Sequence, residues 1–329
     1  MALRFVALIA VAVVSVAVSV LVGYGDLNDA GLRPVLLELR SYRVATAFGV
    51  GACLAVSGVL IQGMFRNALA SPSILGISSG ASLGGQLAML SYSGATVLGI
   101  SVAVAPEMLL PLGCVLGSLA ALGLLILITR NRSDSMTLLL CGFLLTSLFV
   151  SLGAFVTTLG QQTWELGRAM VAFTLGGVAG AGPRQAALIM AIALIGTASA
   201  RTWADPLDVL MTGEEEAESL GVDTRVLKRW CVLWTAILSG AAVAVGGTIG
   251  FVGLIVPHVT RTFVGLSNRR LVPAAALAGG SFVVLCDLIA RALSGQGELP
   301  LGVITGIIGA PTFLFLLLRS RYLEESRDS

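Results

Sequence analysis

The sequence offers few side chains that could bind a nucleotide or carry out a reaction. Lys228 is the single lysine and lies in VLKRW, with no glycines before it. A P-loop needs a lysine directly after a glycine-rich turn to hold phosphates, so we exclude a P-loop ATPase. His258 is the single histidine and lies in VPHVT. We favour a structural role for it over a metal ligand or proton relay, and both alternatives stay open.

Thiol chemistry is equally sparse. The five cysteines are scattered through apolar segments without a CxxC pair, and an odd number does not form a complete set of disulfides. We interpret them as small core residues. They are Cys53, Cys114, Cys141, Cys231 and Cys286. We predict no catalytic residue, no metal site and no cofactor, so we do not expect an enzyme.

Asp287 is the clearest acidic candidate for an ion-coupling site, because transporters driven by ions place carboxylates deep in their spans. It precedes Arg291 by four residues, so the two side chains can neutralise each other on one helix face. The pair also lies towards the outer end of its predicted span. An ion-coupled secondary transporter is therefore disfavoured, although it stays an alternative.

The most hydrophilic internal segment spans residues 202–226. Asp205-Pro206 is expected to break the preceding helix, and Thr212 can cap a short helix with three glutamates in its first turn. Gly221 supplies a C-terminal stop. Ala217 and Leu220 are three residues apart and should share a face. We predict a short cytoplasmic helix outside the membrane; the alternative is a solvated acidic linker.

A second polar connection, RNALASP, spans residues 66–72, where Asn67 and Ser71-Pro72 favour a turn. Small polar residues then enter the next apolar stretch. They could line a water-accessible path, or they could donate hydrogen bonds to carbonyls of their own helix, which we favour. These residues are Ser78, Ser79 and Ser82.

The elements that position these residues must lie in a membrane. Of the 329 residues, 56% are apolar and 12% are charged, against about 45–50% and about 25% in soluble domains. So few charges cannot cover a soluble globule of this size. The composition excludes a cytosolic enzyme, a nucleic-acid-binding protein and a disordered chain. It predicts an all-α polytopic membrane protein.

Ten stretches are expected to cross the bilayer, each with roughly 20 mostly apolar residues. The first could be misread as a signal peptide, but only Arg4 precedes its long apolar run. The stretches are 4–23, 44–64, 73–90, 108–129, 135–159, 184–201, 227–247, 249–265, 272–294 and 301–319. With the N-terminus inside, 14 of the 20 lysines and arginines fall on the cytoplasmic side. Both termini are therefore predicted to be cytoplasmic.

Glycines recur four residues apart in several of these stretches, a spacing that lets helix backbones approach closely in lipid. We favour tight packing in one bundle, and a pore-lining role for some of them is the alternative. The glycines are Gly76, Gly80 and Gly84; Gly113 and Gly117; Gly176 and Gly180; Gly246 and Gly250; and Gly302 and Gly306.

Four stretches together resemble the type II ABC importer permeases that move iron–siderophore complexes, haem and cobalamin. They are GACLAVSGVLIQGMFRNALASPSILGISSGASLGG (51–85), TGEEEAESLGVD (212–223), GTIGFVGLIVPHVTRTFVG (247–265), and the tail from CDLIARAL to TFLFLL (286–318). The resemblance covers nearly the whole chain. It implies one transmembrane permease domain over residues 1–329, with ten spans, in a bacterial inner membrane.

The same resemblance implies partners. It implies a second permease subunit, expected to form a homodimer, and two cytoplasmic ABC ATPase subunits that hydrolyse the ATP. An extracytoplasmic substrate-binding protein is implied as well. Membrane lipid surrounds such a permease, and no nucleic acid is involved.

The resemblance also assigns roles to residues. The acidic segment is similar to the family's coupling loop, which docks into a cleft on the ATPase. The matching positions are Gly213, Glu214, Ala217, Leu220 and Gly221.

Arginines before the second span and near the end of the ninth resemble those that engage acidic residues of the binding protein. Arg suits bidentate contacts with carboxylates. The matching residues are Arg40, Arg43 and Arg291, and LRSYR stands here where the family commonly has LRLPR. The alternative is that these arginines simply lie at the membrane interface.

The RNALASP turn resembles the family's RNPLA segment at the cytoplasmic gate, with Asn67 and Leu69 at the gate positions. Ala68 and Thr248 each stand where proline is usual, which affects the expected gate geometry.

These expectations describe a permease subunit that imports a ferric siderophore or a similar metal chelate by alternating access, driven by ATP. The alternative within the same family is import of haem or cobalamin. Outside it, an ion-coupled secondary transporter and a receptor or structural bundle are less favoured.

Overall fold

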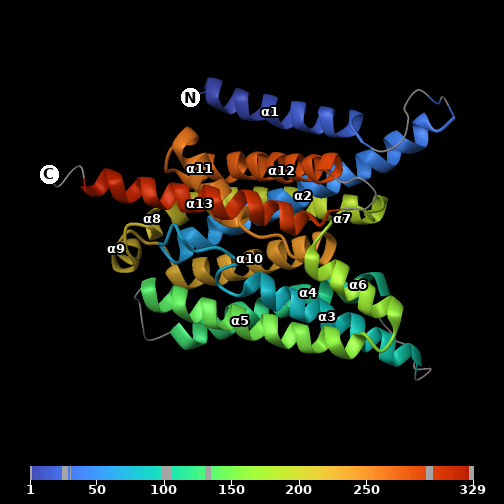
Figure 1. The fold of residues 1–329 in the computed structure, drawn as a ribbon. Helices are drawn as coiled ribbons and strands as arrows, with labels where there is room; N and C mark the ends of the chain where they lie inside the picture. Colours follow the sequence, from blue (N-terminus) through green and yellow to red (C-terminus); the bar gives the residue numbers. More distant parts are fainter. Residues whose placement is uncertain are drawn as a thin grey trace.

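The computed structural model describes residues 2–23, 29, 31–97, 106–129, 135–293 and 299–325. In these ranges the chain is helical and forms no strand, as Figure 1 shows. The helices are α1 (Ala2–Leu21), α2 (Arg33–Met64), α3 (Ile77–Val97), α4 (Pro106–Thr129), α5 (Ser135–Gly160), α6 (Trp164–Leu175), α7 (Pro183–Thr202), α8 (Ala204–Leu210), α9 (Glu214–Ser219), α10 (Thr224–Gly246), α11 (Val252–Val264), α12 (Asn268–Leu293) and α13 (Leu301–Glu325).

Seven of these helices are long and apolar enough to cross a membrane: α1, α2, α4, α5, α7, α10 and α12. Two more apolar segments, α11 and residues 301–316 of α13, are shorter. The all-α polytopic class is confirmed, while ten spans stay a prediction.

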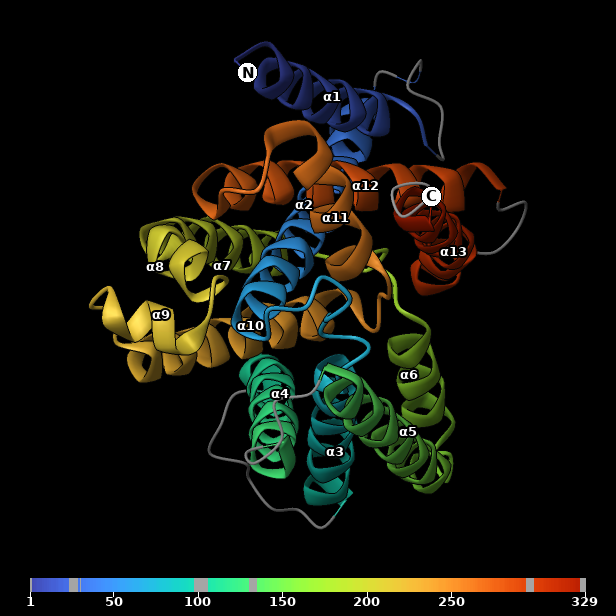
Figure 2. The same cartoon turned by 90° about the vertical axis from the view of Figure 1, so that its left-hand side faces the viewer.

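Helix α2 is the centre of the bundle. Every residue from Gly49 to Met64 is buried, and α2 packs against α7, α10, α11 and α12. Two views show α1 at one edge and α3, α4 and α5 at the opposite edge (Figures 1 and 2). The exposed apolar side chains of α1 and α5 are those expected of helices that face lipid.

Glycines produce a close contact between α3 and α4, as their spacing predicts. A Cβ added at Gly84 or Gly117 would collide with the backbone of the facing glycine, Gly113 or Gly80. Helices α3 and α4 therefore touch backbone to backbone along this stripe, where lipid offers no hydrophobic driving force. At Gly306, by contrast, an added Cβ would meet no atom of a neighbouring element within 4 Å.

The start of α1 and the end of α13 lie at the same end of the molecule as α8 and α9 (Figure 1). This arrangement agrees with the predicted placement of both termini on the side of the acidic segment. Helix α6 lies towards the other end, which we call the outer end.

Several helix ends differ from the sequence prediction, and one helix was missed. Helix α2 begins at Arg33 rather than near residue 44, so it carries Arg40 and Arg43 within the helix. Helix α11 covers only Val252–Val264, because Phe251 adopts a left-handed conformation (φ 66°) that delays its start. Helix α6 was missed in a stretch taken as a connection; Glu165 in its first turn and Gly176 (φ 75°) after its end were the available signals.

Candidate functional site

A buried carboxylate joins two arginines at the outer end of the bundle. Asp287 of α12 accepts hydrogen bonds from Nε and Nη2 of Arg43 at 2.9–3.2 Å, and it pairs with Nε of Arg291 at 3.0 Å. The Asp287 side chain is only 2% exposed. A charge buried this deeply needs partners, and two guanidinium groups supply them.

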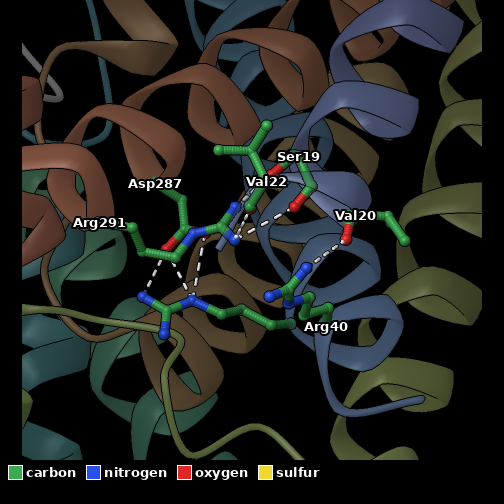
Figure 3. Close-up of polar contacts among 7 residues, drawn as sticks. Ser19, Val20, Val22, Arg40, Asp287 and Arg291 are labelled. Carbon is green, nitrogen blue, oxygen red and sulfur yellow. Dashed lines mark hydrogen bonds and ion pairs between the residues drawn. The ribbon is translucent and has the colours of Figure 1, made fainter. Parts of the chain in front are cut away.

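The same cluster holds the C-terminal end of α1 (Figure 3). Arg40 donates to the carbonyl oxygens of Val20, Leu21 and Gly23. The last carbonyls of a helix have no partner within the helix, and cations are favoured there. The hydrogen bonds from Arg40, and the attraction between its positive charge and the helix end, hold the exposed helix α1 against α2.

Arg291 reaches the same helix end from α12. It donates to the carbonyls of Ser19 at 3.1 Å and Val22 at 2.8 Å, and it contacts the Ser19 hydroxyl. Two arginines from different helices therefore hold one helix terminus.

The three arginines predicted to dock the binding protein therefore lie together, but their exposure to solvent differs. Arg40 and Arg291 are each 7% exposed and engage α1. The Arg43 side chain is 15% exposed. The three guanidinium groups and one carboxylate of this cluster carry a net charge of +2, which favours an acidic partner.

A cavity of about 900 Å³ opens beside this cluster. Arg43 and Asp287 line one part of it, and Trp164 and Arg168 of α6 line another. We call it the outer cavity. The sequence had not associated α6 with the arginines, because its helix was not predicted.

Next to the outer cavity, helices α6 and α10 end and helix α13 begins at one irregular junction. The N–H of Gly177 donates to the carbonyl of Gly246 (2.9 Å), and the N–H of Leu301 donates to the carbonyl of Gly176 (2.9 Å). Gly302 is approached by the carbonyls of Leu175 and Thr248, leaving no space for a side chain. Helices α6, α10 and α13 therefore satisfy each other's terminal backbone groups.

Thr248, which stands where proline is usual, belongs to this junction. Its hydroxyl donates a hydrogen bond to the Thr174 carbonyl of α6. The threonine thus ties the segment before α11 to the end of α6.

A second cavity of about 500 Å³ lies on the other side of the junction. Ser78, Ser79 and Ser82 of α3 line it, and the Ser78 hydroxyl has no hydrogen-bond partner among the described residues. The preferred prediction, hydrogen bonds to carbonyls of their own helix, is therefore wrong for Ser78. We call this cavity the inner chamber.

The predicted turn at residues 66–72 is present. The Asn67 side chain accepts from the N–H of Leu69 (2.9 Å), and the Asn67 carbonyl accepts from Ala70 (3.1 Å). Arg66 has a positive φ of 50°. The two predicted gate residues therefore form one compact turn, with Ala68 exposed.

At the cytoplasmic end, α8 and α9 form the predicted short helical segment. After α9, the N–H of Gly221 donates to Glu218 and that of Val222 donates to Ala217. Gly221 has a φ of 84°, so this is a Schellman motif that ends the helix as predicted. A solvated, unstructured linker is excluded for this segment.

Three details of this segment were predicted wrongly. The chain breaks at Trp203, and Pro206 lies in the first turn of α8. Gly213 rather than Thr212 is the N-cap of α9. Ala217 is fully buried whereas Leu220 is 71% exposed, so they do not share an environment.

The packing beneath the segment fixes it to the bundle. Leu207 of α8 sits against Gly63 of α2, where a Cβ would come within 2.7 Å of it. Trp203 stacks on Trp230 of α10 with ring centroids 5.6 Å apart. One face of α8 and α9 is therefore fixed to the bundle, and the face bearing Leu220 is left outside.

The FecCD transport family matches residues 2–319, nearly the whole chain. The chain belongs to the FecCD transport family. It is thus a multi-pass permease of an ABC importer, and an inner-membrane location fits. FecCD proteins are transport permease subunits rather than enzymes.

The curated relatives of this FecCD permease are named for different transported compounds. The hemin transport permease HmuU of Yersinia pestis is 36% identical, covering 89% of this chain and 86% of that protein. The Fe(3+) dicitrate permease FecD of Escherichia coli is 37% identical (87% and 86%). The vitamin B12 permease BtuC of Vibrio cholerae is 38% identical (88% and 84%).

A solved structure has the same fold as the FecCD permease described here. It is an inward-facing conformation of a metal-chelate type ABC transporter, and it aligns with a TM-score of 0.80 at 31% identity. The alignment covers 96% of this chain and 99% of that one.

We predict that Asp287→Asn destabilises the permease, because it leaves Arg43 and Arg291 without their buried carboxylate. Removing one member of a buried pair costs about 3–5 kcal/mol. Thermal unfolding of the purified protein in detergent should show a clearly lower midpoint. The matched control is Asp205→Asn, whose pair with Arg269 is 62–67% exposed and contributes about 0–1 kcal/mol. Equal midpoints for the two variants would contradict this role of Asp287.

Proposed function

We propose that this chain is the permease subunit of an importer that carries a ferric siderophore or similar metal chelate into the cytoplasm by alternating access. ATP hydrolysis is assigned to separate ATPase subunits. The observation that supports this most directly is the folded α8–α9 segment, which presents an exposed leucine and acidic side chains at the cytoplasmic end. An exposed apolar residue on a fixed helix is suited to a protein partner.

In this proposal, residues 212–221 transmit motion between the ATPase and the bundle. Leu220 enters the ATPase surface, and Glu214 lies at the positive N-terminal end of α9. Gly213 and Gly221 bound the helix, and Ala217 packs it against the bundle. The buried contacts of Ala217 and Leu207 would pass a displacement of α9 to α2.

At the outer end, the excess positive charge around Arg43 supports docking of an acidic binding protein. Arg43 is the most accessible of the three arginines and also lines the outer cavity. Arg40 and Arg291 would contribute by holding α1 and by adding positive charge. A partner carboxylate could contact them directly only by displacing the end of α1.

The remaining parts of the proposal concern assembly and cargo. A second copy of the chain completes a homodimer, with two ATPase subunits, and residues 1–329 form one transmembrane domain. Asn67 and Leu69 form part of the cytoplasmic gate. Haem or cobalamin is the alternative cargo, supported by the names of HmuU and BtuC at comparable identity.

The central test is uptake into proteoliposomes that contain the permease, its ATPase and its binding protein. We predict uptake of a metal chelate that requires ATP inside the vesicles. Leu220→Glu should abolish both uptake and co-purification of the ATPase, since it places a charge in the proposed apolar contact. Val226→Glu is the control, because Val226 is also exposed at this end (45%) but lies outside residues 212–221. Uptake without any ATPase would instead establish a secondary transporter.

We also predict that Arg43→Gln weakens binding of the substrate-binding protein by about thirtyfold, or about 2 kcal/mol, because an interfacial charge pair is lost. Arg291 still pairs with Asp287 in this variant, so the cluster keeps its buried carboxylate neutralised. Binding is measured by titration of the labelled binding protein against the detergent-purified complex. Arg33→Gln, an exposed arginine at the start of α2, should bind like the wild type. Unchanged binding by Arg43→Gln would remove Arg43 from the docking surface.

A further inference from the structure

Helix α9 is too short and too acidic to be stable by itself. It has six residues, four of them glutamates and none of them basic, whereas isolated helices shorter than about 12–15 residues are marginal in water. Repulsion between neighbouring carboxylates weakens it further. The hydrogen-bonded end at Gly221 and the buried side chain of Ala217 supply part of its stabilisation. The rest must come from the elements packed beside it.

Two side-chain contacts join α9 to the first turns of α10. The Lys228 ammonium pairs with the Glu214 carboxylate at 2.5 Å, and the Thr224 hydroxyl donates to the Glu218 carboxylate at 2.7 Å. The two glutamates are four residues apart, as are Thr224 and Lys228, so each set lies on one helix face. The earlier residue of α9 contacts the later residue of α10, so the two helices run antiparallel, side by side (Figure 2). We call these two contacts the α9–α10 clamp.

The two contacts of the clamp differ in strength. The side chains of Lys228 and Glu214 are 37% and 46% exposed, and an exposed ion pair is weak. Thr224 is buried, and its hydrogen bond to a carboxylate is charge-assisted and therefore stronger. Glu218 also lies at the N-terminal end of α10 beside the N-cap Asp223, where the helix dipole favours anions. Thr224 thus holds the end of α9, and Lys228 orients its start.

Helix α10 connects this clamp to the junction of α6, α10 and α13. Its 23 residues extend about 35 Å at 1.5 Å per residue. At its far end the carbonyl of Gly246 accepts a hydrogen bond from Gly177 (2.9 Å), and a Cβ at Gly247 would come within 2.4 Å of the Phe173 carbonyl oxygen of α6. This end therefore contacts the backbone between the two cavities. A rigid helix can carry a displacement from one end to the other.

We propose that Lys228 and Thr224 are positioning residues that clamp α9 to α10, so that a displacement of α9 by the ATPase reaches the junction between the two cavities through α10. This inference rests on the proposed import function and adds a second route to the one through α2. It gives the single lysine of the chain a role in transmission. Loss of the clamp would leave the proposed ATPase contact at Leu220 in place but reduce the motion that arrives at the junction.

The first test measures import per ATP hydrolysed in proteoliposomes that contain permease, ATPase and binding protein. The probe is whichever of ferric dicitrate, hemin and cyanocobalamin the wild type imports. Lys228→Gln/Thr224→Val removes both contacts and should lower import per ATP about tenfold, while the ATPase still co-purifies. Lys228→Arg keeps the ion pair and should couple like the wild type. Arg229→Gln, which removes a positive charge from an exposed neighbour on α10, is the matched control and should also couple normally.

The second test, hydrogen exchange of the purified full-length permease in detergent, does not depend on cargo. The amides of residues 214–220 should exchange about tenfold faster in Lys228→Gln/Thr224→Val than in the wild type or Arg229→Gln, because α9 detaches more often. Lys228→Gln alone gives the same decision if the double variant does not fold.

Unchanged exchange of α9, unchanged import per ATP, or loss of the ATPase from the double variant would each overturn the inference. Absence of import by the wild type would instead contradict the import function, while faster exchange in the double variant would still support the clamp. The two failures are therefore distinguishable.

Discussion

The structure depends on how backbone groups are satisfied where helices stop inside an apolar bundle. No water is available in hydrocarbon to hydrogen-bond a free N–H or C=O group, so irregular backbone is tolerated only where it is buried in protein or lines a cavity. The junction of α6, α10 and α13 meets both conditions. Its terminal groups bond to one another through Gly176, Gly177, Gly246 and Leu301, and it separates two cavities. Glycine is required at Gly176, Gly247 and Gly302, because neighbouring carbonyl oxygens occupy the space that a side chain would take.

This junction lies between one cavity with charged lining residues and a second cavity whose described lining has none. Arg43, Arg168 and Asp287 line the outer cavity, which suits recognition of a charged partner. The polar side chains in the described lining of the inner chamber are serines, threonines and glutamines, and they lie among apolar ones. At the far end, α8 and α9 expose the surface proposed to receive motion from the ATPase.

Features set by local sequence could be predicted, and features set by distant contacts could not. Gly221 ended α9 as its type predicts, and the glycines of α3 and α4 packed as their spacing predicts. Asn67 formed its turn through contacts within four residues. The binding of Arg40 and Arg291 to the end of α1 joins residues up to 272 positions apart, which no local pattern encodes. Helix α6 escaped prediction because a short helix between spans has no long apolar run, and the inner chamber could not be foreseen without it.

The most direct test of this account asks whether water reaches the inner chamber. A single cysteine is introduced at Ser79, which lines the chamber, or at Leu116, which is 63% exposed on α4 outside both cavities. Membrane vesicles are treated with a charged methanethiosulfonate, which reacts with thiolates formed in water. The account predicts that Ser79→Cys is modified at least tenfold faster than Leu116→Cys. Equal, background-level modification of both cysteines would contradict a water-accessible inner chamber.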